Sequence, residues 1–281
     1  MQRRDVPLQR RELRRERAAQ WSRDVRDRPS VEQVPREDPH HPAIFPRLPR
    51  HFLTGTELDA PDLAAILDRA LALKAAPHSS DALRRQTVAL IFEKPSTRTR
   101  LSFEAGVAEL GGHPAVLRSD ELQLSRGESP RDTALVLSRM AAAVGMRTHD
   151  DAILEELAAH ATIPVINLLT AGHHPCQALA DLLTLRETFG QLDGLVLAYV
   201  GDGNNVARSL ALLGPLAGVQ VRIAAPEGYQ LEAIGGLVRT DDPAAAAAGA
   251  NALYTDVWVS MGDEATAAQR LANLAPYRID A

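Results

Sequence analysis

Hydroxyl and guanidinium side chains gather in one short segment that directly follows an apolar run. These side chains belong to Ser96, Thr97, Arg98, Thr99 and Arg100. The apolar run predicts a buried strand over 87–92, and the residues after it predict a helix over 97–110. A helix N-terminus attracts anions, and guanidinium groups bind phosphate in a bidentate manner. The segment therefore indicates a phosphate site, although an ordinary capped helix with exposed arginines fits these residues equally well.

Three further polar residues stand where predicted strands end and helices begin. Arg147 closes an apolar run over 142–147, and His174 and Gln177 stand at the start of a predicted helix over 175–189. In parallel α/β sheets, ligands bind at the carboxyl ends of the strands. Each of these residues alone would be interpreted as a structural or surface side chain, so only their combination indicates a site.

The glycine-rich segment Gly-Asp-Gly-Asn-Asn at 201–205 ends another apolar run and opens a predicted helix over 205–217. A turn of this kind between a strand and a helix suggests a dinucleotide site. However, Val206 stands where the third glycine of that fingerprint belongs. A nucleotide-binding module built on this loop is therefore the weakest hypothesis, and thermal stabilisation by NAD or ATP would support it.

Strand-like and helix-like segments alternate along most of the chain. This alternation predicts the α/β class, with two domains that each contain a mostly parallel sheet flanked by helices. The predicted strands include 87–92, 115–119, 142–147, 163–168 and 252–258, and the predicted helices include 97–110, 151–160, 175–189, 205–217 and 243–250. The predicted domains are 48–185 and 186–281, preceded by a tail over 1–47.

The predicted tail differs in composition from the rest of the chain. Its first thirty residues hold ten arginines and five acidic residues, and a segment rich in proline and histidine follows. We interpret residues 1–47 as a disordered, solvated tail or as translated upstream sequence, rather than as a functional basic arm.

Composition excludes several classes of protein. A chain of 281 residues that is 45% hydrophobic can bury a sizeable core, and its net charge of −5 argues against a nucleic-acid binder. The single cysteine, Cys176, excludes a disulfide framework and disfavours a cysteine-based metal site. No apolar run is long enough for a membrane span, and the first residues lack the apolar core of a secretory signal. We therefore expect a cytoplasmic protein without nucleic-acid or membrane partners.

Four motifs, in this order, resemble those of the aspartate/ornithine carbamoyltransferase family. Pro-Ser-Thr-Arg-Thr-Arg with Ser-Phe-Glu (95–104) resembles its carbamoyl phosphate loop, Met-Arg-Thr (146–148) its strand-end arginine, and His-Pro-Cys-Gln (174–177) its His-Pro-x-Gln element. Asp-Val-Trp-Val-Ser-Met-Gly (256–262) resembles the ornithine branch in particular. The resemblance covers roughly residues 50–280, with gaps.

The resemblance implies transfer of a carbamoyl group from carbamoyl phosphate to the δ-amine of ornithine, giving citrulline and phosphate in arginine metabolism without metal or cofactor. It implies catalytic roles for Arg98, Arg147 and His174, because attack by an amine places negative charge on the carbonyl oxygen that they would polarise. The implied carbamoyl phosphate ligands are Ser96, Thr97, Arg98, Thr99, Arg100, Gln123, Arg147, His174 and Gln177.

The resemblance also implies an ornithine pocket and an oligomer. The pocket would comprise Asn205, Asp256, Ser260 and Met261, because an acid and a hydroxyl suit an ammonium group while amide and backbone N–H groups suit a carboxylate. Gln123 matches a glutamine that reaches the neighbouring subunit's site, which implies a homotrimer or a multiple of one. Cys176 does not match the family's catalytic cysteine, so we interpret it as a small buried residue.

The family has a strand ending in His-Cys-Leu-Pro and a long final helix after its Ser-Met-Gly loop. His-Cys-Leu-Pro does not occur in the 281 residues, and the connection from Pro226 to Asn251 is shorter than the family's. We therefore expect the second domain to be incomplete, with apolar surface uncovered near Leu63 and Leu67. Reduced stability and little or no activity would follow.

Two alternatives stay open. The chain could be a non-catalytic pseudoenzyme or fragment that binds carbamoyl phosphate or joins intact homologues. It could also use aspartate or another amine in place of ornithine, although the motif at 256–262 disfavours this.

Overall fold

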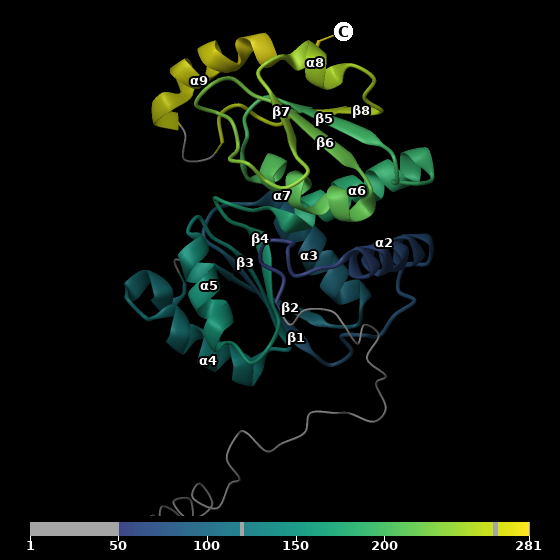
Figure 1. Cartoon of the computed structure of the whole chain (residues 1–281). Helices are drawn as coiled ribbons and strands as arrows, with labels where there is room; N and C mark the ends of the chain where they lie inside the picture. The colour runs from purple at the N-terminus through teal and green to yellow at the C-terminus, as the bar shows by residue number, and fades with distance from the viewer. Residues whose placement is uncertain (1–50, 119–120, 261–263, 281) are drawn as a thin grey trace, which may run out of the picture. The chain divides into compact units, whose positions relative to one another are not determined.

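The computed structural model describes residues 51–118, 121–260 and 264–280. The predicted tail over 1–47 lies outside the described residues. The described residues form one compact unit. Two four-stranded sheets make up its framework, and all strand pairs within them are parallel, as the alternation of segments predicts (Figure 1).

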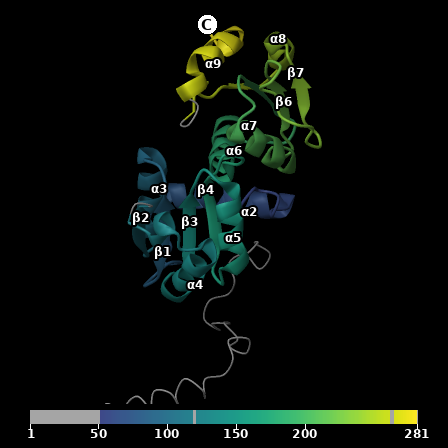
Figure 2. The ribbon, with the colours of Figure 1, turned by 90° about the vertical axis from the view of Figure 1, so that its left-hand side faces the viewer.

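The first sheet has the strand order β2-β1-β3-β4. Its strands are β1 (Thr87–Phe92), β2 (His113–Arg118), β3 (Ala143–Arg147) and β4 (Val165–Leu169), and its helices are α3 (Thr97–Glu109), α4 (Pro130–Met140) and α5 (Asp151–His160). Side chains of β1 alternate between two apolar clusters, because successive residues of a strand point to opposite faces. Ala89 and Ile91 pack with α4 and α5, whereas Leu90 packs with Val107 of α3, so helices cover both faces (Figure 2).

The second sheet has the order β7-β6-β5-β8. Its strands are β5 (Val196–Val200), β6 (Gln220–Ala224), β7 (Val238–Thr240) and β8 (Ala252–Tyr254), and its helices are α7 (Asn205–Leu213), α8 (Pro243–Ala247) and α9 (Ala267–Leu274). Helix α6 (Pro175–Phe189) connects β4 to β5, so the predicted domain boundary after residue 185 falls inside this helix.

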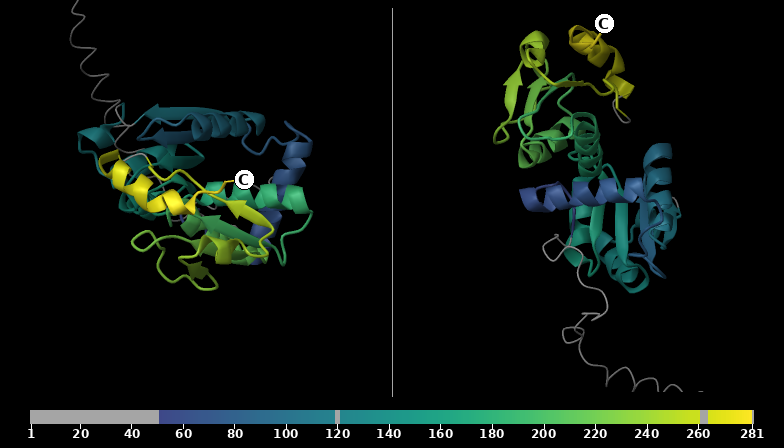
Figure 3. Two further views of the ribbon diagram at one scale, coloured as in Figure 1. Left: turned by 90° about the horizontal axis from the view of Figure 1, so that it is seen from above. Right: turned by 90° about the vertical axis from the view of Figure 1, so that its right-hand side faces the viewer.

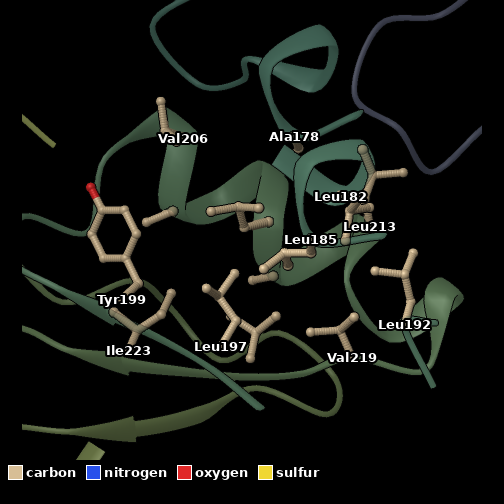
Figure 4. Close-up of a cluster of buried hydrophobic side chains, with 14 of the residues drawn as sticks. Ala178, Leu182, Leu185, Leu192, Leu197, Tyr199, Val206, Leu213, Val219 and Ile223 are labelled. Carbon is tan, nitrogen blue, oxygen red and sulfur yellow. The ribbon is translucent and has the colours of Figure 1, made fainter. Parts of the chain in front are cut away.

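The largest apolar cluster joins the second sheet to α6 and α7. Tyr199 and Ile223 of the sheet face Leu182 of α6 and Val206 of α7 in Figure 4. Helix α2 (Ala60–Ala75), purple in Figure 3, packs against α6. Leu63 and Leu67 of α2 belong to this cluster and are only 1% and 2% exposed. The two leucines are thus not themselves uncovered, because α6 and the 3-10 helix η3 (Pro215–Ala217) contact α2. The expected apolar surface near them takes the form of an open pocket that Leu63 and Leu67 line together with Leu192 and Leu216.

Local signals define several helix boundaries. Asp59 caps α2 through a reciprocal capping box, Ser129 caps α4, and Gly190 ends α6 with a φ of 81°. Both α5 and α6 have the predicted bounds.

Other predicted bounds were wrong. The helix predicted over 205–217 ends at Leu213, because Pro215 cannot donate to a continuing helix and opens a 3-10 turn instead. The strand predicted over 252–258 ends at Tyr254, and the Asp256 carboxylate accepts from the backbone N–H of Val257 at 2.8 Å. Such local side-chain bonds compete with a strand ladder. The helix predicted over 243–250 ends at Ala247, while β7 and α9 were not predicted.

Among the residues described, none of the helices combines the length and apolar character that crossing a bilayer requires.

Candidate active site

The hydroxyls predicted to bind phosphate lie beside the strand-end arginine. Ser96 occupies the N-cap position of α3 but makes no side-chain capping hydrogen bond. Arg147 lies opposite Phe92 in the register of β1 and β3. Its Nη1 donates to Ser96 Oγ at 3.1 Å and to Thr99 Oγ1 at 3.2 Å. The fold thus gathers three of the predicted ligands at the carboxyl ends of two neighbouring strands, next to a helix N-terminus.

This cluster carries concentrated positive charge. Burial lowers the pKa of Arg147, and the positive charge of nearby Arg98 lowers it further. Two cations at the positive end of a helix repel each other, and a bound anion would relieve that repulsion. The Ser96–Arg147 cluster is therefore well suited to phosphate.

Glu93, which sequence reasoning missed, supports the strand ends on which this cluster stands. Its carboxylate accepts from Thr148 Oγ1 at 2.6 Å and from the His149 backbone N–H at 3.3 Å. Its own N–H donates to the carbonyl oxygen of Arg147 at 3.0 Å. The position of an acid directly after a buried strand was the available signal.

Three predicted phosphate ligands lie apart from these contacts in the described structure. Thr97 is exposed at the first position of α3. Arg100 is exposed and its Nε pairs with Glu104 of the same helix at 2.6 Å. Gln123 is exposed in the 3-10 helix η2 (Gln123–Arg126). Their roles as ligands stay predictions.

His174 stands at the start of α6 with its imidazole enclosed. Its backbone N–H donates to Ser209 Oγ at 2.8 Å, which ties the start of α6 to α7. The pKa of His174 is lowered to about 4, mainly by burial and also by the positive charge of Arg147, while the charge of Asp256 opposes this. Its Nδ1 is buried without a hydrogen-bond partner among the described residues. A neutral imidazole near Arg147 is thus available to a bound ligand.

The depressed pKa of His174 predicts a dependence of stability on pH. Between pH values of about 6.5 and about 4, His174 is protonated in the unfolded chain but neutral in the folded chain. The free energy of unfolding therefore falls as the pH falls through this range. From pH 7 to pH 5, the parent should lose about 2 kcal/mol of unfolding free energy relative to His174→Gln, measured by urea denaturation.

Asp181 acts in the opposite direction, since its pKa is raised to about 6 and the folded chain gains its proton first. This contribution is common to both proteins and cancels in their difference. Equal losses in parent and variant would show that His174 is not held neutral.

Gln177 lies one turn after His174 and donates a hydrogen bond to the half-buried Asp181. Its Nε2 donates to Asp181 Oδ1 at 2.9 Å. Asp181 was not predicted, although its spacing of four residues from Gln177 on a helix was a signal for contact.

Asp256, predicted to bind the amino acid, is held by Asn204. Asn204 Nδ2 donates to Asp256 Oδ2 at 2.9 Å. The Oδ1 atom of Asn204 caps α7 by accepting from the N–H groups of Val206 and Ala207, and it also accepts from the Tyr199 hydroxyl at 3.2 Å. Sequence reasoning selected Asn205 and missed Asn204, although asparagine is a preferred N-cap residue.

Asn205 connects the two sheets through their loops. Its Nδ2 donates to the carbonyl oxygen of Thr170, which follows β4, at 2.7 Å. One of its two amide hydrogens is therefore engaged in the protein, while its Oδ1 remains an acceptor. Ser260 is half-buried in the loop after β8, and Met261 lies outside the described residues.

Helix α9 anchors the loop that carries Asp256 and Ser260. Arg270 Nε donates to the Trp258 carbonyl oxygen at 2.7 Å, and its Nη2 pairs with Asp202. The side chains of this ion pair are only 15% and 12% exposed. The guanidinium also lies over the ring of Tyr229, 5.2 Å from its centroid. This contact set fixes the loop against the Gly-Asp-Gly turn.

The glycines of that turn have a structural explanation. A Cβ atom on Gly203 would lie 2.5 Å from the Tyr229 carbonyl oxygen, so close approach of the chain's own backbone requires glycine there. The Gly203 N–H donates to that same oxygen at 2.8 Å. Because this N–H is already bonded, the nucleotide-binding hypothesis gains no support.

Cys176 is not suited to nucleophilic chemistry. Its Sγ donates to the Asn167 carbonyl oxygen at 3.3 Å, and burial raises its pKa to about 12. A protonated, bonded thiol is inert, as predicted. Within the described part of the chain, no three His, Cys, Asp or Glu side chains are grouped so that they could hold a metal ion.

The fold and site define an α/β protein with a cluster of hydroxyl and guanidinium groups on its first sheet and a carboxylate-bearing loop on its second. Family models match both parts. The model described as aspartate/ornithine carbamoyltransferase, carbamoyl-P binding domain, matches residues 50–187, and that of the Asp/Orn binding domain matches residues 193–281. The chain belongs to the aspartate/ornithine carbamoyltransferase family.

The similar proteins and solved structures described next are ornithine carbamoyltransferases. An ornithine carbamoyltransferase of Parafrankia sp. is 51% identical over 248 residues, which cover 82% of this chain and 78% of the relative. One from Acidothermus cellulolyticus is 49% identical with the same coverage. The crystal structure of the ornithine carbamoyltransferase from Thermus thermophilus matches with a TM-score of 0.76 at 41% identity, covering 83% of this chain and 79% of that one. The enzyme from Pyrococcus furiosus matches with a TM-score of 0.76 at 42% identity, covering 82% and 79%.

Proposed function

We propose that the chain transfers the carbamoyl group of carbamoyl phosphate to the δ-amine of ornithine. The observation that carries this proposal is the cluster of Ser96, Thr99 and Arg147, with the neutral His174 near Arg147. The amine attacks the carbonyl carbon, and the bond from that carbon to the phosphate oxygen breaks. Phosphate leaves with the bonding electrons, and the attacking nitrogen gives its extra proton to the departing phosphate, which yields citrulline and inorganic phosphate.

The residues around the first sheet stabilise negative charge on the phosphate group and on the carbonyl oxygen. Ser96, Thr99 and the N-terminus of α3 hold the phosphate group, and Arg98 neutralises it from the exposed side. Arg147 and His174 donate to the carbonyl oxygen, on which negative charge develops during attack. Because these donors are held before the reaction, little reorganisation is needed when the charge appears.

The second sheet supplies the amino-acid pocket. Asp256, held by Asn204, binds the α-ammonium group together with Ser260, while Asn205 and Met261 bind the carboxylate. The negative charge of Asp256 would repel the side-chain carboxylate of aspartate, whereas ornithine carries no such group. Ornithine is therefore preferred to aspartate.

Citrulline formation by the purified 281-residue chain tests this proposal. Carbamoyl phosphate is supplied with ornithine or with aspartate, and thermal stabilisation by each compound is recorded in parallel. Turnover with ornithine supports the proposal, whereas turnover with aspartate alone overturns the choice of amine. Stabilisation by carbamoyl phosphate without turnover would favour the non-catalytic binding protein.

We further propose that the chain acts in arginine metabolism as a homotrimer or a multiple of one, with Gln123 reaching the neighbouring subunit's site. Exposed Gln123 is compatible with such a role. Light scattering after size-exclusion chromatography gives the assembly mass, and a monomer that retains full activity would contradict the proposal. The cytoplasmic location stays a prediction.

A further inference from the structure

One face of α6 carries three polar side chains in succession. Gln177 follows His174 by three positions, and Asp181 follows Gln177 by four. Residues at these spacings lie on one side of a helix. This side is directed toward Asp256, whose charge raises the pKa of both His174 and Asp181. Asp181 therefore extends the row of residues that begins with the active-site histidine, but it has no role in the proposed reaction.

The hydrogen bond between Gln177 and Asp181 has a fixed polarity. Gln177 Nε2 donates to Asp181 Oδ1 at 2.9 Å. An ionised carboxylate only accepts hydrogen bonds, so the amide nitrogen, not the amide oxygen, must face it. The Oε1 atom of Gln177 is consequently turned away from Asp181. One carboxylate thus decides which end of the glutamine amide is presented to a ligand.

The surroundings of Asp181 hold this carboxylate in place. The pKa of Asp181 is raised to about 6, mainly by burial and also by the charge of Asp256, while the hydrogen bond from Gln177 opposes this rise. Tyr254 stacks on Tyr199 with ring centroids 5.4 Å apart. At pH values above about 6 the group is ionised and can only accept, so the orientation of Gln177 is maintained under ordinary assay conditions.

We propose that Asp181 is a positioning residue that fixes Gln177 with its carbonyl oxygen toward the transferred group, so that the site selects a group bearing N–H donors. This inference rests on the proposed function, in which Gln177 contacts carbamoyl phosphate. The carbamoyl amino group donates to Gln177 Oε1. In acetyl phosphate a methyl group of similar size replaces that amino group, which leaves the positioned oxygen without a donor. Binding of acetyl phosphate would bury this oxygen without a hydrogen-bond donor. That costs more free energy than the hydrogen bond alone contributes, because the oxygen also loses its contact with water.

The test compares the dissociation constants of carbamoyl phosphate and acetyl phosphate by calorimetry at pH 8. The parent should bind carbamoyl phosphate more tightly. Asp181→Leu should lower the ratio of the two affinities by about tenfold, the effect of one positioned hydrogen bond. Asp181→Asn keeps the size and the hydrogen bond but allows either amide orientation, so it should fold as the parent does and lower the ratio by a smaller factor.

Glu187→Leu provides the matched control, since it removes a carboxylate further along α6 that pairs with Lys74. It should leave the ratio unchanged. If both Asp181 variants keep the parent's ratio, or weaken both ligands equally, Asp181 has only a structural role and the inference is wrong. A parent that binds neither phosphate would instead overturn the proposed function, which separates the two failures.

Discussion

Replacement of Arg147 by methionine should lower the kcat for citrulline formation by about a thousandfold, the loss expected when a preorganised oxyanion donor is removed. Arg147 donates to both Ser96 and Thr99, so its loss also releases the two hydroxyls of the phosphate site. The expected result is a fall in kcat accompanied by a higher KM for carbamoyl phosphate. Steady-state kinetics at saturating ornithine measure both.

Two further variants distinguish this role from general destabilisation. Arg147→Lys keeps the charge but not the planar fork, so it should restore only part of the activity. Arg139→Met removes an exposed arginine in the last turn of α4 and should leave kcat unchanged. Retention of more than about a tenth of the parent's kcat by Arg147→Met would contradict a role in charge stabilisation.

Periodicity and capping predicted most of the first sheet and its helices, because these signals are local. Asp59, Ser129 and Gly190 each mark a helix end through a hydrogen bond or backbone angle that depends on a few neighbouring residues. β7 and α9 escaped prediction for the opposite reason. β7 is three residues long and lies at the edge of its sheet beside β6, and α9 is tied to the rest of the chain by Arg270, whose partner Asp202 is distant in sequence.

The residues of the candidate site likewise fall into those that the sequence predicted and those that it did not. Ser96, Thr99 and Arg147 were predicted, because their motifs are specific and parallel strands bring their carboxyl ends to one edge. Asp181 was missed because it belongs to none of the motifs, and Asn204 was missed because its role depends on a contact that the Gly-Asp-Gly-Asn-Asn segment does not reveal. The contact of Asn204 with Asp256 joins residues far apart in sequence, so no periodicity could indicate it.

Asp256→Asn should raise the KM for ornithine by about a hundredfold, because a charged hydrogen bond to the α-ammonium group is lost. The change should leave the affinity for carbamoyl phosphate within about twofold of the parent's, since the Ser96–Arg147 cluster stands on the other sheet. Calorimetry with carbamoyl phosphate, followed by kinetics with ornithine as the varied substrate, separates the two effects.

Asn204→Ser tests whether the orientation of Asp256 matters as well as its charge. Serine still caps α7, but the buried Tyr199 hydroxyl loses its acceptor, so the melting temperature should fall by a few degrees. Serine also cannot supply the amide hydrogen that Asn204 donates to Asp256 Oδ2. The KM for ornithine should rise by about tenfold, less than in Asp256→Asn, because the carboxylate remains but is no longer held. If both variants weakened carbamoyl phosphate and ornithine alike, the loop after β8 would be a structural support for the whole site, and Asp256 would not be the ammonium ligand.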